Sequence, residues 1–139
     1  MPHDDTATLS KLSDSRQMTA SSDQDIRGRK VKDKDGNDVG RVDDLLIDDE
    51  EHKVRFLRVE HGGILGFGET RSFIPVDAIT RITANEVFID HSREHVAGAP
   101  RYDPDLVPNV GYYGSLYDHY GHAPFWAMGY TYPGYPYYR

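Results

Sequence analysis

The feature that most constrains the fold is a series of short runs, rich in Val, Ile, Phe and Thr, that fills residues 26–90. Each run has five to nine residues and ends at a turn signal. Such runs are typical of β-strands, because β-branched and aromatic side chains pack well on a pleated surface. Helical periodicity is nearly absent from the same region. The sequence therefore predicts a mainly β protein.

Turn chemistry sets the order of the strands. Asp35-Gly36-Asn37 favours positive φ angles, so it predicts a hairpin between strands at Gly28–Lys32 and Asp38–Ile47. The acidic run Asp48–His52 separates this second strand from another at Val54–Val59, because neighbouring carboxylates repel one another in a ladder. Three further strands follow a glycine-rich connection, at Arg71–Pro75, Ala78–Ile82 and Glu86–Ile89.

Six short strands in about 65 residues are typical of a small closed or partly open antiparallel β-barrel. One short helix is expected, with Ser92 as its N-cap and Gly98 at its end. Several strands carry apolar groups on both faces, so the outer face of the barrel needs a cover. The C-terminal extension or a second protomer can supply it.

Composition divides the chain into three parts. Residues 1–25 carry two basic and five acidic groups with few bulky apolar ones, which predicts a flexible arm that cannot offset its ordering entropy. Residues 26–110 form the barrel domain with a short extension. Residues 111–139 form a Tyr/Gly/Pro-rich tail, which holds nine of the ten tyrosines and shows no useful helical or strand period. We expect its first part to pack on the barrel.

Charge and composition exclude several classes of function. The net charge of -7 argues against nucleic-acid binding, which depends on neutralising phosphates with Lys and Arg. The absence of cysteine excludes disulfides, thiolate metal sites and a cysteine nucleophile. The longest apolar run has four residues, too few for a bilayer span or a signal peptide. We expect a soluble cytoplasmic protein that meets a membrane only through a partner.

No motif for a nucleophile, a general base or a cofactor occurs, so we expect no enzyme, no catalytic residue and no cofactor. Asp33, Asp35 and Asn37 begin like a calcium loop, but the loop lacks the glycine and the glutamate that it needs next. Surface histidines are the simpler interpretation of the seven in the chain, and no metal site is expected.

Two groups of apolar side chains are candidates for contact with a partner. One lies at the tip of a glycine-rich loop, where a phosphate cradle would instead have a lysine and a following helix. The other is the aromatic tail, since Tyr and Trp supply large amphipathic contact areas. The candidate interaction residues are Ile64, Leu65 and Phe67 in the loop, and Tyr112, Tyr113, Tyr117 and Trp126 in the tail.

Several segments together resemble the PRC-barrel family in order and spacing. They are Gly28–Val31, Asp35–Gly36, Val39–Asp48, Arg55–Glu60 and Phe73–Val76. The family includes the barrel of photosynthetic reaction-centre H subunits, a domain of a ribosome maturation factor and many small stand-alone proteins. The chain looks closest to the cytoplasmic barrel of the H subunits, because the segments Phe88–Pro100 and Gly111–Tyr117 resemble the close of that domain.

The resemblance implies a barrel of five or six strands with a C-terminal extension folded on it. It also places Asp48 and Glu51 on the acidic hairpin that contributes to a proton route in H subunits; without a quinone-binding partner we interpret them as surface carboxylates. The branches of the family share docking on another protein. We therefore expect a non-enzymatic interaction or assembly module that binds a protein partner or forms a homodimer.

Two other functions stay open at this point. One is a small-ligand or metal-sensing barrel in which His119, His122 and neighbouring acids form the site. A second pair, His91 and His95, has the i, i+4 spacing that places two rings on one helix face. The other function is a photosynthesis-related role, similar to that of the H subunit, in an electron- and proton-transfer assembly.

Overall fold

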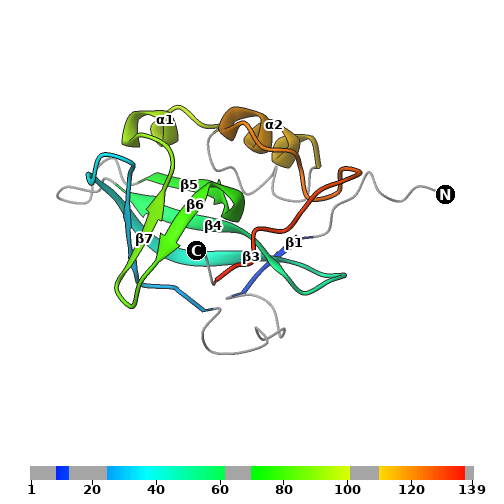
Figure 1. Ribbon diagram of the computed structural model, residues 1–139, viewed down its shortest axis with the longest axis horizontal. Helices are drawn as coiled ribbons and strands as arrows, with labels where there is room; N and C mark the ends of the chain where they lie inside the picture. The colour runs from blue at the N-terminus through cyan, green and yellow to red at the C-terminus, as the bar shows by residue number, and fades with distance from the viewer. Residues whose placement is uncertain (1–8, 13–24, 62–69, 101–109, 137–139) are drawn as a thin grey trace.

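The computed structural model describes residues 9–12, 25–61, 70–100 and 110–136 (Figure 1). Strands dominate these ranges. They are β1 (Leu9–Lys11), β2 (Lys30–Lys32), β3 (Asp38–Asp48), β4 (Val54–His61), β5 (Thr70–Pro75), β6 (Ile79–Ile82) and β7 (Glu86–Ile89). A 3-10 turn, η4 (Val76–Ala78), links β5 to β6, and two helices follow, α1 (Arg93–Ala97) and α2 (Val110–Tyr120). The protein is mainly β, as predicted.

The strands form one sheet in the order β5-β4-β3-β2-β7-β6, and β1 pairs with β3 beside this path. Most neighbours are antiparallel, but β2 and β7 run parallel. The predicted antiparallel arrangement was therefore wrong for this one pair, because no hairpin fixes the relative direction of strands so far apart in sequence. Within the described strands no ladder joins β5 to β6, so the sheet is not closed into a barrel.

The local signals in the sequence are borne out. The β2–β3 hairpin closes through Asp33, whose N–H donates to the carbonyl of Asn37 at 2.9 Å, and Gly36 has a φ of 86°. Helix α1 starts at Ser92, whose hydroxyl accepts from the N–H of His95 at 3.0 Å. Asp33 joins the two elements, because its second carboxylate oxygen accepts from the N–H of Arg93 at 2.9 Å. Its carboxylate thus serves the turn and the helix.

Two elements were not predicted. Strand β1 lies in the predicted flexible arm, where Leu9–Lys11 pair with the C-terminal end of β3. Strand β2 pairs only with the N-terminal part of β3, which leaves this end of the same edge for β1. Helix α2 lies in the tail, where two glycines and several tyrosines weaken helix propensity. Its buried residues nevertheless recur at helical spacing: Tyr112, Tyr113, Leu116, Tyr117 and Tyr120. Packing against the sheet stabilises this helix.

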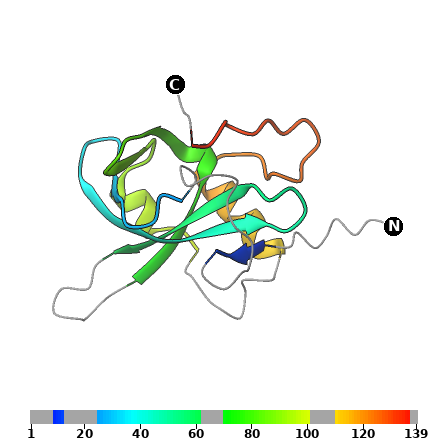
Figure 2. The same ribbon diagram turned by 90° about the horizontal axis from the view of Figure 1, so that it is seen from below.

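Both helices lie on one side of the sheet (Figure 1). The ring of Phe56 in β4 lies 5.4 Å from Tyr113 and 4.9 Å from Tyr117, measured between centroids. Phe73 in β5 lies 6.1 Å from Tyr112. The remaining tail leaves α2 and runs beside the β3–β4 hairpin (Figure 2). In the described part of the chain, neither helix is long and apolar enough to span a membrane.

The close approach of β4 to Gly40 in β3 generates a test. Gly40 has a φ of 156°, and a Cβ there would overlap the backbone carbonyl of Glu60. We expect Gly40→Ala to lower the free energy of unfolding by about 1–3 kcal/mol, because the backbone of β4 must shift. Gly98→Ala is the control, since its Cβ meets nothing nearer than 3.6 Å. Urea unfolding measures both; equal stability of the two variants would contradict the account.

Candidate interaction site

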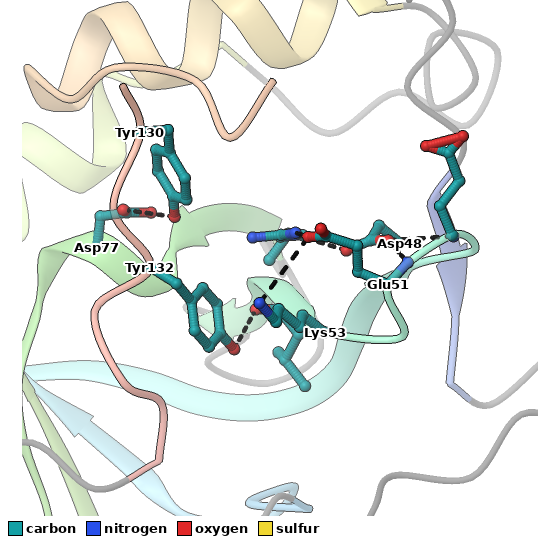
Figure 3. Close-up of polar contacts among 9 residues, drawn as sticks. Asp48, Glu51, Lys53, Asp77, Tyr130 and Tyr132 are labelled. Atoms are coloured by element: carbon teal, nitrogen blue, oxygen red, sulfur yellow. Dashed lines mark hydrogen bonds and ion pairs between the residues drawn. The ribbon is translucent and has the colours of Figure 1, made fainter. Parts of the chain in front are cut away.

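A buried arginine organises the region where the β3–β4 hairpin meets the tail (Figure 3). Arg55, near the start of β4, is 2% exposed. Its Nε donates to Asp48 at 2.6 Å and its Nη2 donates to Glu51 at 2.5 Å. Burial alone would lower the pKa of Arg55, but the hydrogen bond and charge of Asp48 outweigh it and raise the pKa. The guanidinium therefore stays charged inside the fold.

Asp48 serves both the hairpin turn and the arginine. It is 3% exposed. Its Oδ1 accepts from the N–H of Glu50 at 3.1 Å and from that of Glu51, while its Oδ2 accepts from Arg55. The interpretation of Asp48 and Glu51 as surface carboxylates was therefore wrong for Asp48 and incomplete for Glu51. The acidic run turns the chain because one of its carboxylates binds the turn's own N–H groups.

Three aromatic rings of the tail surround the same guanidinium. The Cζ of Arg55 lies 4.3 Å from the ring centroid of Phe125, 5.2 Å from that of Tyr132 and 5.9 Å from that of Tyr130. A cation over an aromatic face is attracted by the ring quadrupole, and more strongly where water is excluded. Arg55 thus binds the tail to the hairpin.

Hydroxyl groups fix two of these rings in place (Figure 3). The hydroxyl of Tyr132 donates to the carbonyl of Val54 at 3.0 Å. The hydroxyl of Tyr130 donates to Asp77 at 2.8 Å. Burial raises the pKa of the Asp77 carboxyl, although the hydrogen bond from Tyr130 opposes this. The tail is therefore attached at β4 and at η4 as well as at Arg55.

Between Phe125 and Tyr130 the tail forms a turn that projects a methionine. The N–H of Tyr130 donates to the carbonyl of Ala127 at 3.1 Å, and Gly129 has a φ of 81°, which closes a turn of this kind with little strain. Met128 stands at its corner and is fully exposed, at 101% of its reference area. We call Phe125, Trp126 and Met128 the tail surface.

The structure separates the candidate interaction residues into three groups. Tyr112, Tyr113 and Tyr117 are 7%, 0% and 0% exposed, so their rings face the chain's own sheet. Trp126 is half-buried, 5.8 Å from Tyr117 and 5.1 Å from Phe125 between centroids. The loop residues Ile64, Leu65 and Phe67 lie outside the described residues. Binding of a partner by any of these side chains stays a prediction.

Sequence reasoning missed Arg55 and the three rings around it. Two signals were available. Arg55 is a cation between the apolar residues Val54 and Phe56, and it follows the last acidic residue of the run, Glu51, by four positions, which favours pairing with these acids. Its contact with Phe125, Tyr130 and Tyr132 had no local signal, because it joins segments some 70 residues apart.

Four histidines meet where α1 faces the end of α2. The rings of His95 and His119 stack at 4.1 Å, those of His91 and His95 at 4.8 Å, and His122 lies 6.3 Å from His91. The Nε2 atoms of His95 and His119 each bond to the backbone carbonyl of the other residue, at 2.8 and 2.7 Å. Because a carbonyl oxygen only accepts, both Nε2 atoms carry a proton.

This histidine cluster brings together the two pairs singled out in the sequence, His91 with His95 and His119 with His122. The contacts of these rings pack the two helices against each other. A ring nitrogen that donates a proton to a carbonyl has no lone pair for a metal. Among the residues that the structure describes, no three His, Asp or Glu side chains are placed to hold a metal ion.

A comparison with protein families supplies the identification. The family model of the PRC-barrel domain matches residues 18–96, more than half of the chain. The chain belongs to the PRC-barrel family. The match covers β2 to β7 and all but the last residue of α1, so α2 and the tail that packs around Arg55 lie beyond this PRC-barrel region. No curated protein matches the chain.

The buried pair in this PRC-barrel protein predicts a large effect of one substitution. Arg55→Met should lower the free energy of unfolding by about 3–5 kcal/mol, because Asp48 would remain as a buried charge without its cation. Arg93→Met is the control. The side chain of Arg93 is 55% exposed and its guanidinium lies 3.8 Å from the carboxylate of Glu94, so a change within about 0.5 kcal/mol is expected. A loss below about 1 kcal/mol for Arg55→Met, by urea unfolding, would contradict the role of Arg55.

The histidine cluster predicts that stability falls in mild acid. Burial lowers the pKa of His91, and the charge of His95 adds to this, while Asp90 opposes it. The unfolded chain, with a histidine pKa near ~6.5, then binds more protons than the folded chain, so stability is complete above about pH 6.5 and decreases below it. His91→Gln should reduce the decrease of the melting temperature between about pH 6.5 and 5. A profile identical to that of the wild type would exclude His91 as the cause.

Proposed function

We propose that this PRC-barrel protein is a non-enzymatic interaction module of the cytoplasm, which binds a protein partner through the tail surface. The observation that carries the proposal is Met128, fully exposed on an ordered turn beside the half-buried Phe125 and Trp126. Methionine and aromatic side chains are enriched at the centres of protein interfaces. Methionine is also flexible, so it adapts to the shape of a partner.

The way in which the tail is held supports this function. An interface built on an ordered segment loses less conformational entropy on binding than one built on a free tail. Arg55, Tyr130 and Tyr132 hold the segments on either side of Met128 to the hairpin, to η4 and to β4. The turn is therefore presented before any partner arrives.

The same contacts also support a role without catalysis. The ionisable groups around Arg55 are engaged with one another: Asp48 with the arginine, Asp77 with Tyr130. A general base or nucleophile must instead be within reach of a substrate proton or carbonyl. We include in the proposal that the chain catalyses no reaction.

A closer likeness to reaction-centre H subunits is also part of the proposal, supported by the segments that resemble the close of that barrel. In this protein the first of those segments runs from the end of β7 through α1, and the second lies on α2. A proton route through the acidic hairpin has less support, because Asp48 accepts from Arg55 and from two backbone N–H groups. The likeness therefore favours docking on a partner over proton transfer.

Substitution of the exposed methionine tests the proposed function. We expect Met128→Asp to abolish specific capture of a partner from the native host's lysate, since a carboxylate would be desolvated in an apolar contact. Thr131→Asp is the matched control: it adds the same charge at another exposed tail position. Capture is quantified by mass spectrometry, and sedimentation velocity detects self-association.

The result that supports the proposal is one set of proteins, or a self-association, that the wild type and Thr131→Asp retain and Met128→Asp loses. Far-UV circular dichroism checks that all three chains fold alike. Equal behaviour of the two variants, or a monomeric wild type that captures nothing specific, would overturn it.

A further inference from the structure

A second surface, next to the start of β2, concentrates positive charge. A groove of about 720 Å³ lies where the chain enters β2 and the β6–β7 turn approaches β3. Four cations line it, against two carboxylates, so its local charge is +2 in a chain with a net charge of -7. Its charged residues are Asp25, Arg27, Arg29, Lys30, Arg41 and Glu86.

Backbone carbonyls hold two of these arginines in position. The Nη1 of Arg29 donates to the carbonyl of Thr83, and the Nη1 of Arg41 donates to the carbonyl of Gly28, each at 2.9 Å. A carbonyl positions a guanidinium without neutralising it. Arg27, in contrast, pairs with Asp25 through two hydrogen bonds of 2.8 and 2.7 Å.

The other three cations of the groove are not engaged in close ion pairs with the carboxylates that the structure describes. Across residues 25–61, 70–100 and 110–136, no carboxylate forms an ion pair with Arg29, Lys30 or Arg41. Three like charges on one groove repel one another, and an acidic protein has carboxylates enough to pair them. Charge that is held in position and left unpaired favours an anionic ligand from outside.

The backbone around the groove distinguishes between kinds of anion. A phosphate cradle needs free N–H groups that converge on the ligand. Here the N–H of Gly28 donates to Val42 at 2.7 Å, that of Lys30 donates to Asn85 at 3.1 Å, and that of Glu86 donates to the Thr83 hydroxyl at 3.0 Å. These three N–H groups are engaged within the chain, so the groove offers a ligand chiefly side-chain donors, and arginine forks match carboxylates well.

We propose that this groove binds a carboxylate-rich segment of a partner protein. The forks of Arg29 and Arg41 pair with its Asp and Glu side chains, and the ammonium of Lys30 adds a third contact. Long polyanions such as nucleic acid are disfavoured by the negative charge of the rest of the molecule. The groove and the tail surface are separate, so this inference stands without the proposed function.

Binding of a labelled oligoglutamate peptide to the full chain, followed by fluorescence anisotropy at low salt, tests the proposal. Oligoglutamine is the neutral peptide, and inorganic phosphate and an oligothymidylate are the competing anions. Lys30→Glu/Arg41→Glu should weaken oligoglutamate binding by about tenfold or more, because two ion pairs become repulsive contacts. The matched control, Lys34→Glu/Arg93→Glu, changes the net charge equally at two exposed positions outside the groove and should stay within about twofold of the wild type.

Three results would overturn the proposal: equal weakening by both double variants, no preference for oligoglutamate over oligoglutamine, or tighter binding of phosphate or oligothymidylate. If the charge reversals disturb folding, the neutral double variant Lys30→Gln/Arg41→Gln serves as a second test and should also weaken oligoglutamate binding. Met128→Asp should leave peptide binding unchanged, so failure of the groove and failure of the tail surface are distinguishable.

Discussion

Arg55 is a cation that is 2% exposed, so the fold keeps it almost entirely from water. The arrangement of the hairpin and the tail follows from the groups that this buried cation requires around it. An isolated buried charge is strongly unfavourable, so it requires both a counter-charge and a shell that satisfies its donors. Asp48 and Glu51 supply the charge, and Phe125, Tyr130 and Tyr132 supply the shell. The hairpin and the tail therefore depend on each other.

Helix α2 also contributes side chains to the core. Tyr113 and Tyr117 are fully buried against Phe56, so helix α2 covers the apolar face that the strands alone would leave open. The two surfaces that we propose for partners are the turn at Met128 and the groove at Arg41. One is apolar and the other cationic, which suits two different kinds of contact, or two regions of one partner.

Local chemistry explains what the sequence could predict. The hairpin at Gly36, the acidic turn at Asp48 and the cap at Ser92 each depend on a few neighbouring residues, and the structure has all three. Strand β1, helix α2 and the environment of Arg55 depend on distant partners: β1 forms on an unpaired edge of β3, and Gly114 in α2 is tolerated because the sheet buries the helix. The parallel pairing of β2 with β7 likewise has no local signal.

The central claim is that the sheet and the tail fold as one unit, and the single tryptophan allows a direct test. Trp126 lies in the tail against Tyr117, whereas far-UV circular dichroism reports chiefly on the sheet. Thermal unfolding followed by tryptophan fluorescence and by circular dichroism should give coincident transitions, as a cooperative unit requires. A fluorescence transition at clearly lower temperature than the loss of the sheet would show that the tail detaches alone, and would contradict the account.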